Sequence, residues 1–582
     1  VKYLVDNAEM FFVPIVNPDG YVYNETTAPN GGGMWRKNRR NNGDGTFGVD
    51  LNRNYSYNWG ANNTGSSPNT GNDTYRGPSA ASEPETKNME TFCNQHTFKI
   101  ATNYHTYGNL LIYPWGGGTP AYTIDSAQYT TYGAHLTSYN HWSYGTAAQT
   151  VLYTTNGTSD DWMYGEQISH PKIMAMTPEA GKSDEGFWPP NYRIIPICQD
   201  AVWTNLHICH LALKYAVAKD NEQNYISNLT GYFNYKLQRL GMDGPSTYSV
   251  SIIPISSAIT SVGATKVYSS LSLMQEESDS ISYTLSGATP NGQLIKYVIT
   301  VDNGSYIIKD TIVKRYGKPV IVFSSKGNSM TGWSSTTGWG ISTAKFHSSP
   351  SSITDSPSGN YGNSKNTSIH TTTQLDLSNA ISAQLSFWGM WDIETNRDYL
   401  EVQASNDNGS SWIPLCGKFT KNGNGNQDPD QPLYDAFIKS WLYEEMPLDD
   451  YIGQKILIRF NLITDNAGSY DGFYFDDLKV EKIVNIPQGI NENLQNDFVL
   501  SQNMPNPARN EISIAYSLPS TIFDASLEFF NSIGELVKEE KLNRTAGIAI
   551  VDISSFAKGI YFYRIKTEKL SSSVLKMVVI NE

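Results

Sequence analysis

The chain has 582 residues and a formal net charge of −14 at neutral pH, and 12% of its residues are aromatic and 17% charged. The aromatic content suffices for packed cores, so the composition excludes a globally disordered chain, and the length favours about four domains. The negative charge argues against nucleic acid or an anionic membrane surface as a partner, and no run of about 20 apolar residues is present to span a bilayer. The four cysteines, Cys93, Cys198, Cys209 and Cys416, are too few for a disulfide framework.

The first residues predict the end of a helix over 1–9, followed by a buried strand over the apolar segment 10–16. A domain that opens in this way, at Val1 rather than at Met, looks truncated, so we expect its first part to lie upstream.

Residues 1–222 alternate predicted strands and helices, which is typical of an α/β domain. Ser82 and Glu85 have the spacing of a capping box that opens a helix running to about Gln95. A strand over 98–104 delivers His105 to its carboxyl end, and an amphipathic helix over 196–218 closes the domain.

The helical pattern nearly vanishes after this domain. Short alternating runs broken by Gly, Asn and Pro predict three β-sandwich domains. We place a small immunoglobulin-like or fibronectin-like sandwich at 223–316, a larger one at 317–486 and a last one at 492–582. The segment 485–493 is typical of a linker.

A loop rich in guanidinium groups is the most informative feature of the first domain. It runs from Met34 to Arg40 and resumes at 49–55 with Val-Asp-Leu-Asn-Arg-Asn-Tyr. Guanidinium groups grip carboxylates through paired, charge-assisted hydrogen bonds, so a loop that gathers them beside Asn52 is suited to hold an anion. A solvated basic face is the alternative.

An ordered set of motifs across residues 1–218 resembles the zinc metallocarboxypeptidases, the enzymes that remove single residues from peptide C-termini. The motifs are Asn17-Pro-Asp-Gly20, Trp35-Arg-Lys37, Asp50-Leu-Asn-Arg-Asn54, Tyr75-Arg-Gly-Pro78, Ser82-Glu-Pro-Glu85, His105, Tyr113-Pro-Trp-Gly116, Tyr153, Asp161-Trp162 and Thr177-Pro-Glu179. The resemblance implies a multidomain protein. Its α/β carboxypeptidase domain, a mixed sheet flanked by helices and incomplete at its N-terminus, precedes three all-β sandwiches.

The resemblance also implies roles for single residues. Asn52 and Arg53 match the pair that binds the substrate's terminal carboxylate, and Tyr153 matches the mobile tyrosine that closes over it. Arg36 matches the group that stabilises the oxyanion, and Glu179 matches the catalytic base. We expect Lys37, Arg39 and Arg40 to be structural or solvated.

Asp160 aligns with the floor of the pocket for the C-terminal side chain. An acid there resembles the members that remove Arg or Lys, so a preference for basic C-terminal residues is our hypothesis. Some bacterial relatives with an acid in this pocket accept both classes.

His105 matches one of three zinc ligands, two His and one Glu, that this family uses with a bound water. The other two come from a His-x-x-Glu motif, and none of the nine histidines of this chain has Glu at the third position after it. We therefore expect one zinc ion per enzyme, with two ligands upstream of Val1, and no tight zinc binding or activity in the chain as given.

The β regions carry two further resemblances. Residues 317–486, hereafter the jelly-roll region, resemble jelly-roll domains appended to secreted bacterial peptidases. This region contains clustered acidic residues that either bind calcium through their carboxylate oxygens or are ordinary loop residues. They are Asp392, Glu394, Asp398, Asp465, Asp471, Asp476 and Asp477. Residues 492–582 resemble the C-terminal sorting domain of type IX secretion, which implies the secretion machinery as a partner.

The sequence thus favours a metallocarboxypeptidase that is secreted, or held at the outer surface of a Gram-negative bacterium, and acts on peptide or protein C-termini. A catalytically inactive peptide-binding or adhesion protein is the main alternative. A glycan-binding protein built from the β modules is the weakest.

Overall fold

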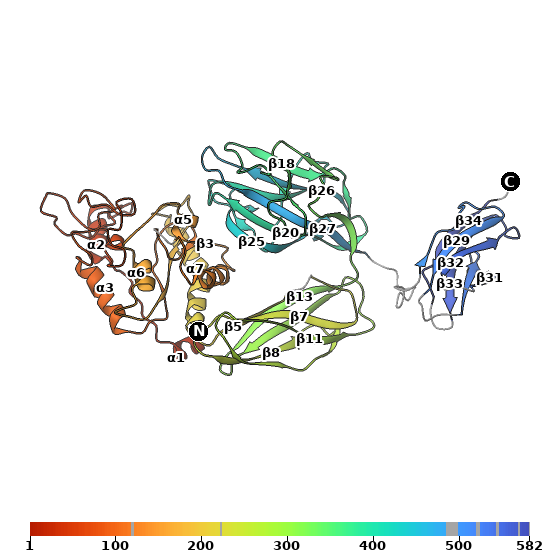
Figure 1. The fold of residues 1–582 in the computed structure, drawn as a ribbon, viewed down its shortest axis with the longest axis horizontal. Helices are drawn as coiled ribbons and strands as arrows, with labels where there is room; N and C mark the ends of the chain where they lie inside the picture. The colour runs from red at the N-terminus through yellow and green to blue at the C-terminus, as the bar shows by residue number, and fades with distance from the viewer. Residues whose placement is uncertain are drawn as a thin grey trace. The chain divides into compact units, whose positions relative to one another are not determined.

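The computed structural model describes residues 1–117, 121–220, 224–484, 499–518, 524–542, 546–567 and 571–580. It divides into two compact units, Val1–Asn485 and Ile486–Glu582. Figure 1 labels the elements of both units. The linker expected at 485–493 lies outside the described residues.

The first part of the chain is an α/β domain built on a small mixed sheet. The strands are β1 (Ile100–Thr102), β2 (Leu110–Ile112), β3 (Ser143–Gly145) and β4 (Met174–Glu179), in the order β1-β4-β2-β3. The helices are α1 (Lys2–Asn7), α2 (Pro18–Thr27), η1 (Leu51–Arg53), α3 (Pro84–Gln95), α4 (Ser126–Leu136), α5 (Ala147–Thr150), α6 (Ser159–Gly165), η2 (Asn191–Arg193) and α7 (Ile194–Leu211). β4 is parallel to β1 and antiparallel to β2, and all six of its residues are buried. The mixed sheet with flanking helices confirms the predicted fold class.

Three predictions for this domain were wrong. Residues 10–16 form no strand, because no described strand pairs with them, and the side chain of Phe12 is 82% exposed. The helix predicted from Ser82 begins at Pro84 without a side-chain cap, because the Ser82 hydroxyl donates to the carboxylate of Glu83 instead.

The third wrong prediction concerns the closing helix. It ends at Leu211, and the apolar residues after it continue as strand β5 (Ala216–Asp220), which pairs with a strand of the following sandwich. Apolar alternation over a few residues suits a helix end and a strand equally well.

The next region is a sandwich of two sheets. One sheet has the order β10-β8-β12-β13-β6 and the other β5-β7-β11-β9. The strands are β6 (Tyr225–Ile226), β7 (Thr230–Arg239), β8 (Ser246–Pro254), β9 (Ile259–Val262), β10 (Lys266–Leu271), β11 (Glu276–Leu285), β12 (Leu294–Asp302) and β13 (Ile307–Tyr316). Phe233, Tyr248 and Tyr297 are among the residues of the core between the sheets.

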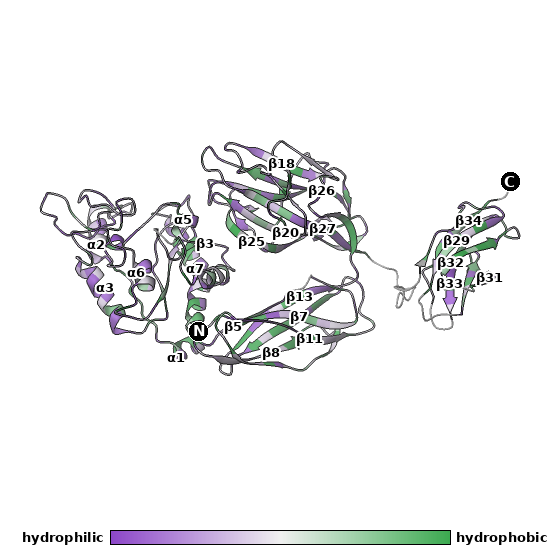
Figure 2. Ribbon diagram, viewed as in Figure 1, coloured by the Kyte–Doolittle hydropathy of each residue, from purple (hydrophilic) through white to green (hydrophobic). Residues whose placement is uncertain are grey.

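The jelly-roll region contains two six-stranded sheets. One follows β16-β17-β27-β20-β25, with β14 beside β27, and the other follows β15-β18-β26-β21-β22, with β19 beside β26; β23 and β24 pair separately. The elements are β14 (Val320–Ser325), β15 (Trp333–Ser335), β16 (Gly340–Ser342), β17 (Ser352–Thr354), β18 (Asn366–Thr371), β19 (Leu375–Asp376), β20 (Ala380–Ile393), β21 (Tyr399–Ser405), β22 (Ile413–Pro414), β23 (Lys421–Asn422), β24 (Pro432–Leu433), β25 (Ala436–Pro447), η3 (Asp449–Tyr451), β26 (Lys455–Ile463) and β27 (Gly472–Val484). Their strands carry both hydrophobic and hydrophilic residues (Figure 2), as in sheets with one face on a core.

The second unit also contains two sheets, β28-β29-β32 and β31-β30-β33-β34. The strands are β28 (Val499–Leu500), β29 (Glu511–Ser517), β30 (Ala525–Phe530), β31 (Leu536–Leu542), β32 (Ala546–Asp552), β33 (Gly559–Thr567) and β34 (Leu575–Val579). Phe529 and Tyr563 are among its core residues.

All four cysteines are free. Within the described ranges, no helix combines the length and apolarity needed to cross a membrane.

Candidate active site

Asp50 organises the guanidinium-rich loop. Its carboxylate pairs with Nη2 of Arg36 at 2.9 Å and accepts a hydrogen bond from the backbone N–H of Asn52 at 3.2 Å. The side chain is buried, and its backbone N–H donates to the carbonyl of Tyr75. Sequence reasoning missed this residue, although an Asp two positions before the residue it caps is a recognisable side-chain turn signal.

Arg53 and Asn52 sit on the short helix η1 that Asp50 opens. The Arg53 side chain is buried, its Nη1 donates to the carbonyl of Asn52 at 2.7 Å, and its Nε has no hydrogen-bond partner. Oδ1 of Asn52 accepts from the N–H of Ser159 at 2.9 Å, and its Nδ2 lies 3.2 Å from Nε2 of His105. A buried guanidinium with an unused donor is costly unless an anion arrives, so this pair is suited to a carboxylate.

His105 and Glu179 are placed side by side by the sheet. The N–H of His105 donates to the carbonyl of Pro178 at 2.9 Å, and the N–H of Ala180 donates to the carbonyl of His105 at 3.0 Å. The strand order thus brings together two residues that lie 74 positions apart in the sequence. Burial lowers the pKa of His105, which favours the neutral imidazole.

Glu179 has an unusual carboxyl group. It is 8% exposed, and its buried Oε2 has no hydrogen-bond partner. Burial raises its pKa to about 8, the charge of Asp160 adds to the rise, and the charge of Arg36 opposes it. A carboxyl group that titrates near neutral pH can both accept and return a proton.

Asp160 and Asp161 lie in the first turn of helix α6 and are both buried. Asp160 accepts hydrogen bonds from Thr177 Oγ1 at 3.2 Å and from the N–H of Asp161 at 3.0 Å. Asp161 accepts from the N–H of Gly116 at 2.9 Å, and burial, with the charge of Asp160, raises its pKa.

Tyr153 lies in the loop before α6 and is 54% exposed. Partial burial raises the pKa of its hydroxyl, the charge of Glu179 adds to the rise, and the charges of Arg53 and Arg36 oppose it. Apart from burial, the charges of Asp50 and Asp160 raise the pKa of His105. The charges of Arg36 and Arg53 lower it. Charged candidate residues thus perturb the pKa values of His105, Tyr153 and Glu179, and Asn52 lies 3.2 Å from the His105 ring.

The other basic residues of the loop make contacts of their own. Lys37 is buried and donates to the carbonyls of Thr70 and Asn72. The Arg39 guanidinium stacks over three aromatic rings, those of Tyr23, Trp35 and Phe47, with the nearest centroid at 3.7 Å. Arg40 pairs with Glu83 at 2.8 Å.

The described residues do not provide a full zinc site at His105. In the described ranges, the one group of three or more side chains with metal-ligand geometry is Glu394, Asp398 and Asp465, far along the sequence in the jelly-roll region. The two histidines of α7 are used in packing, since His207 stacks on Trp203 at 3.7 Å and its neighbour His210 stacks on Tyr215. Among the described residues, His105 therefore belongs to no group of side chains that could hold a metal ion.

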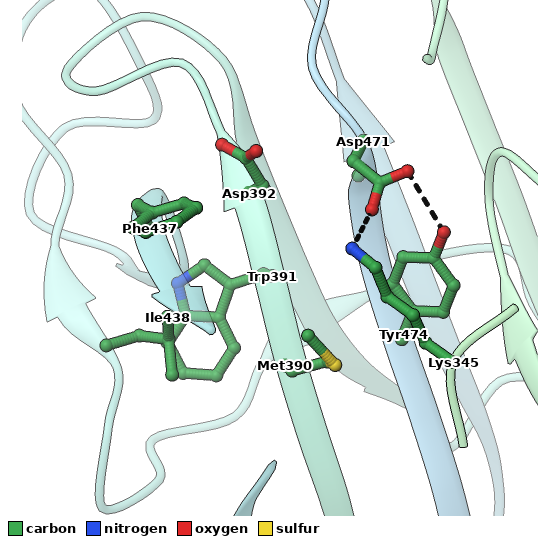
Figure 3. Close-up of a pocket in the computed structure, with 9 residues that line it drawn as sticks. Lys345, Met390, Trp391, Asp392, Phe437, Ile438, Asp471 and Tyr474 are labelled. Atoms are coloured by element: carbon green, nitrogen blue, oxygen red, sulfur yellow. Dashed lines mark hydrogen bonds and ion pairs between the residues drawn. The ribbon is translucent and has the colours of Figure 1, made fainter. Parts of the chain in front are cut away.

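The acids of the jelly-roll region have different surroundings. Asp392 and Asp471 line a pocket with Met390, Trp391, Phe437, Ile438 and Tyr474, in which Lys345 pairs with Asp471 (Figure 3). Asp476 accepts from the backbone of His347 and Ser348, and Asp477 contacts the His347 ring. Of the seven acids singled out from the sequence, three share one cluster.

Family models match three parts of the chain. Residues 1–204 match the zinc carboxypeptidase model, 355–487 the immune inhibitor A-like MAM domain and 504–581 the secretion system C-terminal sorting domain.

Curated relatives match the first of these parts. Mast cell carboxypeptidase A of Rattus norvegicus is 34% identical over 228 residues, which cover 36% of this chain and 51% of the relative. Carboxypeptidase B of Bos taurus is 31% identical, covering 38% and 51%. This chain thus spans about half the length of these curated relatives. The structure of bovine thrombin-activatable fibrinolysis inhibitor with a tick carboxypeptidase inhibitor aligns with a TM-score of 0.30 and 27% identity, covering 34% of this chain and 67% of that one.

Proposed function

We propose that this protein, whose residues 1–204 form a zinc carboxypeptidase domain, acts on peptide C-termini as an exported metallocarboxypeptidase. We further propose that the present 582 residues supply the part of the active site that recognises the substrate and transfers protons. The observation that carries this proposal is geometric: the backbone of His105 bridges to that of Glu179, and the Asn52 amide next to the buried Arg53 lies 3.2 Å from the His105 ring.

Recognition of a free C-terminus follows from Arg53 and Asn52. The buried Nε of Arg53 has no partner, and the Asn52 amide lies beside it on η1. A terminal carboxylate would satisfy the guanidinium through charge-assisted hydrogen bonds, whereas an internal peptide bond would leave that charge buried and uncompensated. This difference restricts action to the last residue of a chain.

Arg36 and Glu179 provide the polar chemistry of peptide hydrolysis. Asp50 orients Arg36, so its guanidinium can act as a fixed donor to developing negative charge, an effect typically worth roughly 3 kcal/mol of barrier. Glu179, whose pKa is raised to about 8, would take a proton from water and pass it to the departing amine.

Asp160 would set the preference for the C-terminal side chain, and Tyr153 would cover the bound residue. Among the described residues no ion pair involves Asp160, so a Lys or Arg of the substrate would give this buried carboxylate its counter-ion. We therefore propose a preference for basic C-terminal residues.

His105 is the zinc ligand that we assign to this chain. A zinc ion there needs ligands that neither a described cluster nor any His-x-x-Glu motif of this sequence supplies. We therefore expect the present chain to bind peptide C-termini but not to hydrolyse them when zinc is added.

Export is the role that we propose for the C-terminal unit. Its match to a secretion sorting domain supports delivery by the type IX machinery to the surface or exterior of a Gram-negative bacterium.

The test is binding followed by turnover. A peptide ending in Arg should bind with its free carboxylate and lose most of its affinity when the same peptide is amidated. Equal affinities would end the proposal. The second candidate, an inactive peptide-binding protein, predicts the same binding result, so turnover must separate the two functions. Chelator-sensitive release of the terminal residue by a chain with a complete zinc site supports the enzyme. Such turnover by the present chain would contradict our assignment of the zinc ligands.

A further inference from the structure

Three carboxylates meet where loops of the jelly-roll region converge. Glu394 directly follows β20, Asp398 directly precedes β21, and Asp465 lies in the loop between β26 and β27. Each contributes an oxygen, and these three oxygens lie within 4.8 Å of one another. Carboxylates this close repel each other unless protons or a cation intervene.

Two of the carboxylate oxygens are buried without a partner. Asp398 is 0% exposed; its Oδ1 accepts from the N–H of Asp465 at 2.6 Å, while no donor meets its Oδ2 with regular hydrogen-bond geometry, although the Tyr361 hydroxyl interacts with the same carboxyl group. Oε2 of Glu394 is likewise buried and unpartnered. Burying a carboxylate oxygen without a donor or a metal costs free energy, so these oxygens are expected to have a ligand.

The surrounding backbone closes tightly on the cluster. Asp465 accepts from the N–H of Ala467 at 2.8 Å, which turns the chain back toward Glu394. Gly468 has a φ of +76°, and a Cβ at that position would lie 1.9 Å from Oε2 of Glu394. A glycine is therefore required where the loop passes over the carboxylate.

We propose that Glu394, Asp398 and Asp465 bind a calcium ion. The donor set is all oxygen and anionic, which suits hard cations, and the cluster contains no His or Cys to favour zinc. Irregular loops can complete the six to eight oxygen ligands of calcium with water or carbonyl groups, whereas magnesium demands near-octahedral geometry. The ion would give the two unpartnered oxygens a ligand and offset the repulsion.

The site would also order a loop that contacts the peptidase domain. Asn396 lies between two of the ligands in sequence, with a φ of +64°, and its Nδ2 donates to the carbonyl of Gly108 at 3.1 Å. Gly108 is three residues beyond His105. Calcium is thus positioned to fix the loop 394–398 against the segment that carries His105.

The test is calcium titration of the full chain after chelation, by calorimetry and by terbium luminescence. Tyr361, whose hydroxyl accepts from the N–H of Glu394 at 3.0 Å, can sensitise terbium. We expect one ion per chain at this site with a dissociation constant between about 1 µM and 1 mM, and weaker binding of magnesium. Asp398→Asn should weaken calcium binding at least about 10-fold, while Asp450→Asn, which removes an exposed carboxylate of the same region, should not.

Melting temperatures separate a calcium site from a merely structural cluster. In chelator Asp398→Asn should melt at or above the wild type, because it removes a buried charge; in calcium it should melt below the wild type, because it loses the ion. No binding at roughly 10 mM calcium, ten times the weak end of the expected range, would overturn the proposal, as would unchanged affinity in Asp398→Asn. If Asp398→Asn does not fold, Glu394→Gln at a partly exposed position answers the same question.

Discussion

The raised pKa of Glu179 makes the stability of the peptidase domain depend on pH. The folded chain holds the Glu179 proton up to a pH of about 8, whereas the unfolded chain releases it near the ordinary value of 4.5. The folded state therefore binds more protons between these values, and its stability falls as pH rises through that window. The difference corresponds to an upper limit of roughly 5 kcal/mol, and we expect about 2–4 kcal/mol once the site relaxes.

Glu179→Gln removes this titration while keeping the shape of the side chain. The variant should match the wild type near pH 4.5 and exceed its free energy of unfolding by about 2–4 kcal/mol at pH 8.5. Urea denaturation in chelator can be followed by labelling Cys93, which is 2% exposed and lies in the same core cluster as Ala175 of β4, in a background where the other three free cysteines are replaced by serine. A thiol-exchange reagent that also reacts at acidic pH allows both conditions to be compared.

The exposed Glu25 provides the matched control, because Glu25→Gln should change neither value. A stability difference between wild type and Glu179→Gln that is the same at both pH values would refute the assignment of a buried, proton-holding carboxyl group at this position.

Three further predictions follow from the same site. Asp50→Asn should lower the free energy of unfolding in urea by about 1–3 kcal/mol and weaken peptide binding, because Arg36 and η1 lose the carboxylate that holds both. If neither stability nor peptide affinity changes, Asp50 does not organise the loop. Asp160→Asn should weaken binding of a peptide ending in Arg at least about 10-fold in calorimetry and leave a peptide ending in Leu unaffected or tighter, and an equal loss for both would exclude charge recognition. Arg39→Ala should lower stability by roughly 1–3 kcal/mol through its lost aromatic stack but leave the affinity for free carboxylates unchanged, and a large affinity loss would move Arg39 into the site.

Much of the site could be predicted because its residues occur in short motifs in a fixed order. His105 and Glu179 follow apolar runs that form β1 and β4, so their place at strand ends was readable from the sequence. Lys37 and Arg40 were predicted to be structural or solvated, and the structure shows which carbonyls and which carboxylate hold them.

The errors occurred where long-range partners decide the local structure. The apolar segment 10–16 has the composition of a strand, but a strand exists only with a hydrogen-bonded neighbour, and no described strand lies beside it. Ser82 has the spacing of a helix cap, yet its hydroxyl is also a hydrogen-bond acceptor for Asn54, a residue 28 positions away. The role of Asp50 depends in the same way on an ion pair that spans 14 residues of loop.

The central claim is that the guanidinium-rich loop and Glu179 belong to one site, and proton uptake on peptide binding tests it most directly. Calorimetry at pH 8 in buffers of different ionisation enthalpy measures the protons exchanged when a peptide ending in Leu binds. A bound carboxylate near Arg53 would raise the pKa of Glu179 further, so the wild type should take up as much as about half a proton per peptide. Glu179→Gln should bind the peptide without this uptake. Uptake of the same size in Glu179→Gln, or none in the wild type despite binding, would contradict the shared site.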